Sequence, residues 1–439
     1  MSECNSMTAP DLGSSPRMLP GCIPPDADQL NKNCFCITLD RDVLNGNLEH
    51  ESAEQDFGAT FAGARQHLFS STPVFLPRSI VEEMHGVAKA IEVASRLEGY
   101  RNAALFWAPE IAHRDHGPAG AFMGYDFHLD EGGPKLIEIN TNAGGAFLNA
   151  ALARAQKACC TELEQSFRQA QLDDFEAKAA DMFRSEFVRQ RSGGSLRRMA
   201  IVDDRPTEQY LYPEFVLAKQ VLRRHGIEAM IADASDLRYE NGKLMLDGIE
   251  IDLVYNRLVD FALERPEHTA LRAAYQDGAV VVTPNPHNHA LLADKRNLTL
   301  LSRPAAMAAF GLPSDLRMRL AGIPKTTMVT PGNADRLWME RNGLFFKPAS
   351  GHGSKAVYRG DKVTRSVWQD IARGGYVAQA FTPPSRRMIQ VDGALTSRKM
   401  DVRLYTYRGD LLLVAARLYQ GQATNFRTPG GGFAAVLMV

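Results

Sequence analysis

The spacing of hydrophobic residues changes along this chain, and each change marks a different kind of segment. From Ser79 to about Arg96 apolar residues recur every three or four positions, which predicts an amphipathic helix. The runs ALFWAPEI, AFMGYDFHL and KLIEIN predict short strands. Residues 149–191, rich in alanine and charge, predict one or two long helices, whereas residues 1–60 show little periodicity and predict a flexible segment.

A second pattern begins after SGG at 192–194. The runs RRMAIVDD, PEFVLAKQVLRRHG and IEAMIAD read as strand, helix and strand, which predicts a parallel sheet covered by helices. Asn-Gly and Asp-Gly turns in LRYENGKLMLDGIEIDLVYNRL predict a small hairpin, and AVVVTPNP adds a further strand. In the last third, LFFKPAS, AVYRG and YVAQAF predict strands, and MDVRLYTYRGDLLLVAARLY predicts a hairpin that turns at Gly409 and Asp410.

Composition narrows the class of protein. The 439 residues are 45% hydrophobic and 23% charged, as in a soluble globular protein of one to three domains. The 50 basic and 51 acidic residues nearly cancel, so nothing supports a nucleic-acid or membrane surface. The six cysteines show no C-x-x-C spacing; Cys34 and Cys36 could bind a metal or react, but incidental thiols are the simpler interpretation. We expect a cytoplasmic protein without a signal peptide.

Lys347 is the first candidate for chemistry. It directly follows the apolar run LFF and shortly precedes the glycine-rich stretch SGHGSKAVY. Glycines let backbone N–H groups approach an anion, so a lysine beside such a turn is well placed to contact phosphates. The stretch matches neither the P-loop nor the dinucleotide pattern, and on its own an ordinary hairpin loop explains it more simply. Lys295, at the expected start of a helix, could likewise be a surface lysine.

Two pairs of polar residues stand two positions apart on expected strands. Glu138 and Asn140 should share one strand face, where a carboxylate and an amide oxygen suit Mg²⁺. Ile137 and Ile139 should then face the core. Asp401 and Arg403 form the second pair, and could serve a metal and a phosphoryl group or form a structural salt bridge. Arg417 is expected on the returning strand, and Asn425 follows it.

Together these groups resemble the ATP-grasp superfamily. The resemblance implies two lobes that hold Mg²⁺ and ATP between them, with Lys295 and Lys347 on the phosphates. It implies a covering loop with Ser350, Gly351, Gly353 and Ser354, and a hinge strand with Gln379, Ala380 and Phe381, where the Ala380 backbone contacts adenine. It assigns Arg403, Arg417 and Lys347 to catalysis and Glu138, Asn140, Asp401 and Asn425 to the metal. Asn142, Arg257 and Arg427 are the candidates for the acid substrate.

The order of these motifs indicates a circular permutation. In the common ATP-grasp arrangement the E-x-N strand follows the D-x-R, arginine and Gly-Gly segments, whereas here it precedes them. This order is similar to eukaryotic-type glutathione synthetase and, more distantly, to glutathionylspermidine synthetase. The fold expectation is therefore α/β, with permuted α+β ATP-grasp lobes and an inserted parallel-sheet substrate domain. The expected parts are a flexible segment (1–60), part of the ATP-grasp domain (61–195), the substrate domain (196–285) and the nucleotide-binding lobes (286–439).

The resemblance implies a carboxylate–amine ligase that works through an acyl phosphate, with small acid and amine substrates and a homodimer. Ala143 and Gly145 stand where glutathione synthetases have substrate-binding serines, and Gly124 replaces an arginine, so glutathione synthesis itself is not expected. A small-molecule kinase and a nucleotide-binding module without turnover stay open as alternatives. A Rossmann-type enzyme is a poor alternative, because the first βα turn, VDDRPTEQ, lacks glycine.

Overall fold

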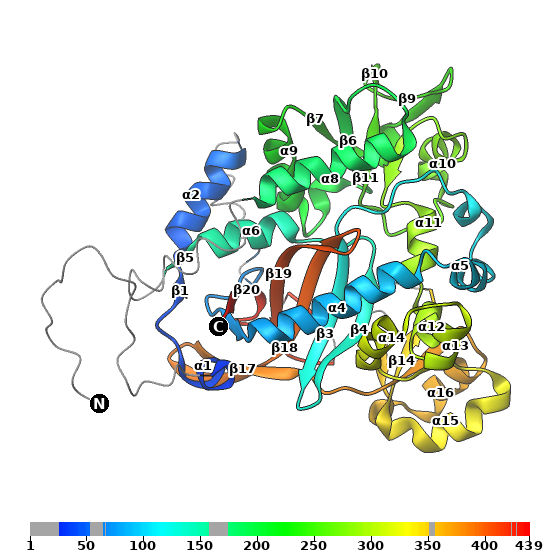
Figure 1. Ribbon diagram of the computed structural model, residues 1–439. Helices are drawn as coiled ribbons and strands as arrows, with labels where there is room; N and C mark the ends of the chain where they lie inside the picture. Colours follow the sequence, from blue (N-terminus) through cyan, green and yellow to red (C-terminus); the bar gives the residue numbers. More distant parts are fainter. Residues whose placement is uncertain are drawn as a thin grey trace, which may run out of the picture.

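Three sheets of four or more strands organise the described part of the chain, shown as a computed structural model in Figure 1. The structure describes residues 26–52, 65, 67–157, 174–350, 356–422, 424–426 and 428–439. The expected mixed α/β class, with a parallel sheet, is confirmed.

The central sheet joins strands from both ends of the sequence. Its strand order is β2-β20-β19-β18-β3-β4, and β17 pairs with one end of β18. Its strands are β2 (Val74–Leu76), β3 (Met123–Asp130), β4 (Gly133–Asn140), β17 (Ser385–Val391), β18 (Ala394–Tyr407), β19 (Asp410–Tyr419) and β20 (Gly432–Met438). The predicted hairpin is present as β18 and β19. Arg408 and Gly409 form its turn with φ of 54° and 88°, values that match a two-residue type I′ turn.

One face of the central sheet is apolar and covered by α4 (Arg78–Ala94), the helix that the sequence predicts (Figure 1). Tyr125, Val402 and Leu404 are buried in the core cluster that includes this helix. The Tyr125 hydroxyl also donates to Glu92 Oε1 of α4 over 3.0 Å. Because side chains alternate across a strand, residues 126 and 403 point to the opposite face. The covered face therefore fixes which polar residues point to the other side of the sheet.

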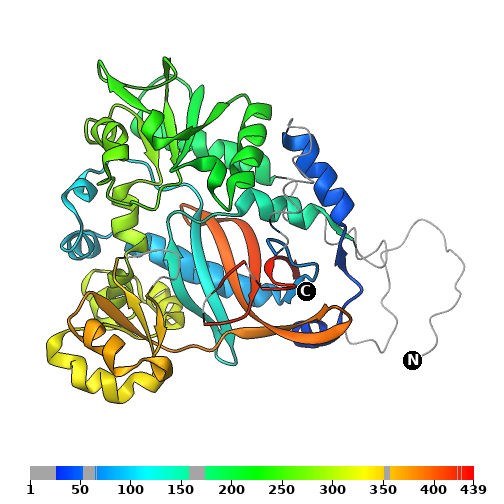
Figure 2. The same cartoon turned by 180° about the vertical axis from the view of Figure 1, so that it is seen from behind.

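A small lobe lies beside that opposite face, as the view from behind shows (Figure 2). Its sheet has the order β13-β16-β14-β15, and its strands are β13 (Thr326–Met328), β14 (Leu344–Pro348), β15 (Tyr358–Arg359) and β16 (Tyr376–Ala380). Its surrounding helices are α12 (Leu298–Leu301), α13 (Pro304–Ala309), α14 (Ser314–Arg319), α15 (Ala334–Glu340) and α16 (Arg365–Ala372). Phe346, Ala378 and Trp368 pack in the lobe's own core, so Phe345, Lys347 and Gln379 lie on the other face of this sheet.

The expected βαβ pattern gives a parallel sheet with the order β12-β11-β6-β7. Its strands are β6 (Arg198–Asp203), β7 (Glu228–Asp233), β11 (Leu253–Asn256) and β12 (Val281–Thr283), with α8 (Phe175–Gln190), α9 (Tyr212–Arg224), α10 (Thr269–Gln276) and α11 (Pro286–Asn288) around them. A small sheet of β8 (Arg238–Glu240), β9 (Lys243–Leu246) and β10 (Ile249–Glu250) stands where the hairpin was predicted. From β6 the chain adds β7 on one side and β11 on the other, which makes the gap between β6 and β11 a topological switch point.

Two sequence expectations need correction. The run ALFWAPEI is not a strand: it finishes α5 (Glu98–Leu105) and enters a 3-10 turn at Glu110–His113, because Pro109 interrupts the run. Part of the segment expected to be flexible is ordered, since α1 (Ala27–Asn33), β1 (Thr38–Leu39) and α2 (Arg41–Ser52) lie within it. The remaining α-helix and β-strand in the described part of the chain are α6 (Ala146–Arg154) and β5 (Gln156–Lys157).

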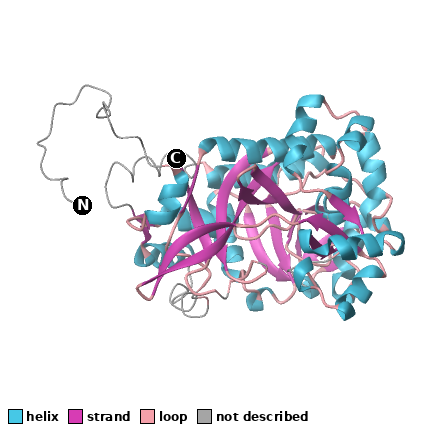
Figure 3. Cartoon of the chain, turned by 90° about the horizontal axis from the view of Figure 1, so that it is seen from below, coloured by secondary structure: helices cyan, strands magenta, loops and turns pink. Residues whose placement is uncertain are grey.

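Helices lie around the outside of the strands when the molecule is seen from below (Figure 3). None of the helices in the described part of the chain has the length and apolar character that a membrane crossing requires. The expected domain boundaries stay a prediction.

Candidate functional site

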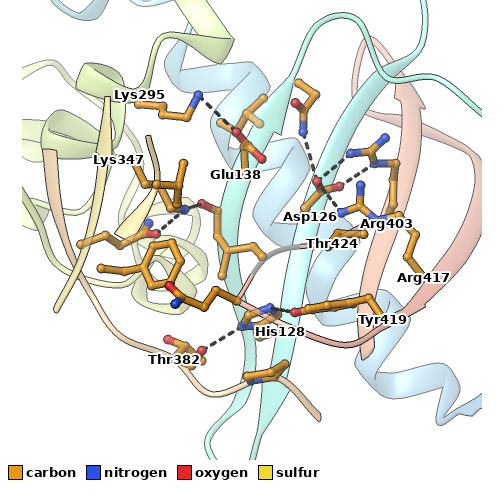
Figure 4. A pocket seen from close by; sticks show the side chains of 18 of the residues that line it. Asp126, His128, Glu138, Lys295, Lys347, Thr382, Arg403, Arg417, Tyr419 and Thr424 are labelled. Carbon is orange, nitrogen blue, oxygen red and sulfur yellow. Dashed lines mark hydrogen bonds and ion pairs between the residues drawn. The ribbon is translucent and has the colours of Figure 1, made fainter. Parts of the chain in front are cut away.

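A cavity of about 760 Å³ lies between the open face of the central sheet and the small lobe. Strands β3, β4, β18 and β19 supply one wall, and β14 and β16 supply the other (Figure 4). Ten of the residues predicted for the site line it: Glu138, Asn140, Asn142, Lys295, Lys347, Gln379, Ala380, Phe381, Arg403 and Arg417. The sequence stretches that carry chemistry therefore meet in one place.

Asp126, which was not among the candidates, is the centre of the charged wall. Its carboxylate is 1% exposed and accepts from Arg403 Nε at 2.6 Å, Arg403 Nη2 at 2.7 Å and Arg417 Nη2 at 2.8 Å. The strand register brings Arg403 to Asp126, because Arg403 of β18 lies directly opposite Asp126 of β3. Burial alone would raise the pKa of Asp126, but the two guanidinium groups hold it well below its usual range. The signal in the sequence was a lone acid inside the apolar run AFMGYDFHL.

Arg417 is held from both sides. Its Nε donates to Asp401 Oδ1 over 2.7 Å, while its Nη2 reaches Asp126. Burial would lower the pKa of Arg417, but these two carboxylates raise it. Asp401 also accepts from the Thr424 hydroxyl. Asp401 is 1% exposed and lies behind Arg417 rather than on the cavity wall, so the structure shows it as a group that orients the arginine.

Glu138 and Asn140 share the cavity face of β4, as predicted. Glu138 Oε1 lies 3.2 Å from Lys295 Nζ, and 34% of its side chain is exposed. Burial raises the pKa of Glu138, but Lys295 and Lys347 outweigh that effect and lower it. Asn140 Nδ2 donates to Asp126 Oδ2 over 3.1 Å, which sets the direction of its amide oxygen. The two oxygen-bearing side chains therefore stand on one face within the cavity.

Lys347 owes its position to an irregularity in β4. The pairing of β3 with β4 shifts between Asp126 and Phe127 and leaves Ile137 as the extra residue. The Ile137 carbonyl accepts from Lys347 Nζ over 2.6 Å, and Gln379 Oε1 accepts from the same ammonium over 2.8 Å. Ile137 itself lines the cavity and is only partly buried, so the expectation that it faces the core is wrong, whereas Ile139 is buried as expected. Burial lowers the pKa of Lys347 to about 8, against the opposing effect of Glu138.

Two aromatic side chains line the cavity next to β16, the strand predicted to be the hinge. The rings of Phe345 and Phe381 lie nearly parallel, with centroids 6.3 Å apart and an interplanar angle of 16°. Ala380 lines the cavity, but its N–H donates to the Lys325 carbonyl over 2.8 Å, and the Phe381 N–H donates to Gly343 over 2.9 Å. These two backbone donors are therefore engaged within the protein.

His128 is a second residue that sequence reasoning did not place in the site. It stands two positions after Asp126 on the same strand face and lines the cavity. Its Nδ1 lies 2.8 Å from the Thr382 carbonyl, and its Nε2 lies 3.3 Å from the Tyr419 hydroxyl (Figure 4). Burial lowers the pKa of His128, partly opposed by Asp401. His128 thus links β3 to the segment that leaves the hinge.

The residues expected to hold the acid substrate are placed differently from one another. Asn142 lines the cavity, and its Nδ2 donates to the carbonyls of Arg257 over 2.6 Å and Leu258 over 3.0 Å. Arg257 is 6% exposed, lies at the end of β11 behind the 141–145 loop, and does not line the cavity. A Cβ atom at Gly144 would come within 2.9 Å of Arg257 Nη2. The side chain of Arg257 is therefore next to the loop rather than in the open space.

Two further predicted residues lie away from the cavity wall. Asn425 closes a turn, where its Nδ2 donates to the Gln420 carbonyl and its Oδ1 accepts from the Thr428 hydroxyl. Ser350 is exposed and does not line the cavity. Gly351, Gly353, Ser354 and Arg427 lie outside the described residues. The metal and substrate roles of these residues stay predictions.

The donor set of the cavity suits a hard cation bound with phosphate. In the described part of the chain no group of three or more His, Cys, Asp or Glu side chains could hold a metal alone. Glu138 and Asn140 offer two oxygens, and Mg²⁺ commonly takes one or two protein oxygens with the rest from phosphate and water. The residues therefore fit a magnesium that arrives with a nucleotide.

Comparison with solved structures places the fold. A glutathione synthetase-like effector from Globodera pallida, in its apo form, is 13% identical, with a TM-score of 0.58 over 91% of this chain and 98% of that one. The two chains share one fold. A putative gamma-glutamylcysteine synthetase from Methylobacillus flagellatus KT has a TM-score of 0.45 at 11% identity, over 78% of this chain and 84% of that one. No protein-family model and no curated protein matches the sequence.

The likeness to the Globodera protein confirms the ATP-grasp-like fold that the motifs indicated, and the structural resemblance to glutathione synthetase-like proteins. At this level of identity it shows the fold alone. What the cavity does must be argued from its own residues.

Proposed function

We propose that this protein joins a carboxylate to an amine with Mg²⁺–ATP, through an acyl phosphate. The observation that carries the proposal is the convergence of Lys295, Lys347, Arg403 and Arg417 on the cavity that Glu138 also lines. Four cations and one partly exposed carboxylate, drawn from both lobes, suit a triphosphate and its metal. Phosphoryl transfer depends mainly on positioning and charge stabilisation, which such an array supplies.

The lysines hold the phosphates in this proposal. Lys295 is now paired with Glu138, and Lys347 with Gln379 and a backbone carbonyl. Triphosphate oxygens offer Lys295 a stronger partner, and they can accept from the one N–H of Lys347 that Gln379 and the Ile137 carbonyl leave over. Mg²⁺, when bound, neutralises charge on the phosphates, and Glu138 and Asn140 would hold it.

Arginines 403 and 417 stay fixed while the reaction proceeds. Each is locked by Asp126, so neither needs to reorganise when charge develops on the transferring group. The substrate carboxylate oxygen attacks the γ-phosphorus, the bond from that phosphorus to the bridging oxygen breaks, and ADP leaves. The neutral amine nitrogen then attacks the acyl carbon and the carbon–oxygen bond to phosphate breaks. The nitrogen loses one proton, which passes to the released phosphate or to water. The products are an amide, ADP and phosphate.

The acid substrate enters from the side of the 141–145 loop. Asn142, Val259 and Phe261 line that end of the cavity, and the last two follow β11 at the switch point where α/β sheets bind ligands. Arg257 would meet a substrate carboxylate if the loop shifts, and its buried Nε has no hydrogen-bond partner in the described part of the chain. Asn142 is the direct contact in this proposal, and Arg257 supplies charge behind it.

The circular permutation is supported by strand order. The E-x-N strand β4 and the D-x-R strand β18 both pair with β3, although they are far apart in sequence. A permuted chain needs this arrangement to rebuild one metal and phosphate face from distant segments.

Phosphate release with Mg²⁺ and ATP tests the proposal. The enzyme is assayed with amino acids, dipeptides and polyamines in acid–amine pairs, and products are identified by mass. We expect ADP formation that requires both an acid and an amine, with a condensed product. Lys347→Ala should abolish it, whereas Lys362→Ala, at an exposed position of the same lobe, should not. Phosphate transfer to a hydroxyl compound without any amine would instead identify a kinase, and absence of ATP binding would refute the proposal.

A further inference from the structure

Gln379 carries a hydrogen-bond donor that has no acceptor among the described residues. The side chain is 2% exposed and lines the cavity, and its Nε2 is buried without a partner. A buried donor without an acceptor destabilises the protein. Because this donor lies in a cavity wall, a ligand in the cavity is the group that would satisfy it.

The orientation of the Gln379 amide is fixed by Lys347. Lys347 Nζ can only donate, and the acceptor 2.8 Å away is Gln379 Oε1. Turning the amide over would set an NH₂ group against an ammonium. The donor end must therefore be the one that is left for a ligand.

The surroundings of Gln379 offer further donors. Lys347 is beside it, and the Arg359 guanidinium lies over the Phe381 ring at 5.0 Å. The backbone N–H groups of Ala380 and Phe381 are already engaged by carbonyls of the protein. A flat base stacked against Phe345 or Phe381 would thus present its edge to the Gln379 amide.

Purine bases differ at the edge that would meet the Gln379 donor. Guanine and hypoxanthine offer two acceptors, N7 and O6, whereas adenine offers N7 and a donor at N6. We infer that Gln379 reads the purine base and that the site binds 6-oxopurine nucleoside triphosphates at least as tightly as ATP. This inference rests on the proposed nucleotide site and adds its base preference.

Calorimetric titration of the whole protein with Mg²⁺–ATP, Mg²⁺–ITP and Mg²⁺–GTP tests the inference. ITP isolates the change at position 6, since it lacks the 2-amino group of GTP. We expect the wild-type Kd for ITP to equal or fall below that for ATP. Gln379→Glu keeps an acceptor for Lys347 but replaces the donor with an acceptor, and should shift the ITP-to-ATP preference about tenfold toward ATP. Gln390→Glu, the same change at an exposed position of β17, should leave the preference unchanged.

Wild-type binding of ATP more than about threefold tighter than both ITP and GTP would overturn the base preference while leaving the nucleotide site intact. An unchanged ITP-to-ATP ratio in Q379E would overturn it equally. If Q379E does not fold, Gln379→Met removes the amide and should weaken ITP more than ATP; equal weakening would overturn the inference. Failure of all three nucleotides to bind would refute the proposed function, and the base preference with it.

Discussion

At the scale of single residues, the site depends on charges that are matched before any ligand arrives. Asp126 neutralises two arginines, Asp401 holds one of them a second time, and Glu138 pairs with Lys295. Buried ion pairs add little net stability, but removal of one partner leaves an uncompensated charge. The arrangement therefore keeps cations in the cavity wall that would otherwise be costly to bury.

Asp126→Asn tests this arrangement. The change leaves Arg403 without its carboxylate and Arg417 with only one, so we expect a loss of about 3–5 kcal/mol in the free energy of unfolding, measured by urea titration. Asp370→Asn removes the acid of an exposed pair with Arg373, with side chains 69% and 77% exposed, and should change little. Equal effects of the two substitutions would show that Asp126 is not the centre of the cluster.

Lys347 should make nucleotide binding depend on pH. Its pKa of about 8 in the free protein results from burial, and phosphate binds the charged form, so binding is strongest below pH 8. Above that value the proton must be taken up on binding, and the affinity should fall by up to about tenfold per pH unit. Calorimetric titrations with Mg²⁺–ATP between pH 7 and 9.5 measure how steeply the affinity falls with pH. In Lys347→Arg the side chain stays charged over this whole pH range. If the affinity of this variant still falls with pH, a group other than Lys347 causes the pH dependence.

Sequence reasoning found the lysines, Glu138 and the arginines, because their types and spacing carry a chemical meaning. It missed Asp126 and His128, because a polar residue within an apolar strand has no partner in the sequence that reveals its role. Strand register supplies that partner: Asp126 lies opposite Arg403, and His128 meets Tyr419 only after the sheet forms.

At the scale of elements, local signals predicted helix α4, strands β3, β4 and β6, and the β18–β19 hairpin. They failed where the pattern was ambiguous: ALFWAPEI is apolar and short, and periodicity alone does not separate such a strand from the end of a helix. The bulge at Ile137 was also invisible, since an extra residue shows only against its partner strand. That bulge is the reason that a carbonyl is free for Lys347.

The loop between β4 and α6 depends on Gly145, the residue before the helix. Gly145 has φ of 99°, and a Cβ atom there would lie 2.3 Å from Phe433 Cζ. Gly145→Ala should therefore cost about 3 kcal/mol or more in the free energy of unfolding, from backbone strain and overpacking together. Gly226→Ala has a similar φ of 75° with no atom within 4 Å, and should cost only about 1 kcal/mol. Equal losses in thermal or urea unfolding would remove the steric part of this explanation.

At the scale of the whole molecule, two sheets face each other across the cavity and a parallel sheet borders one end of it. The small lobe has its own core around Phe346 and Trp368, but α12 and α13 also pack in the core that includes α4 and the central sheet. His128 and the Thr382 carbonyl join the two parts. The fold could be predicted because several motifs indicated it together, whereas the substrates could not, since the cavity end near Asn142 has few charged side chains that specify one acid.

The most direct test of the proposed ligation is the fate of a carboxylate oxygen. Acids of the substrate panel are labelled with heavy oxygen in their carboxylates and incubated with the protein, an amine, Mg²⁺ and ATP, and the released phosphate is analysed by mass. Formation of an acyl phosphate transfers one carboxylate oxygen to phosphate, so the account predicts labelled phosphate in step with amide formation. Turnover that releases only unlabelled phosphate would contradict it, because the carboxylate would then never have been phosphorylated.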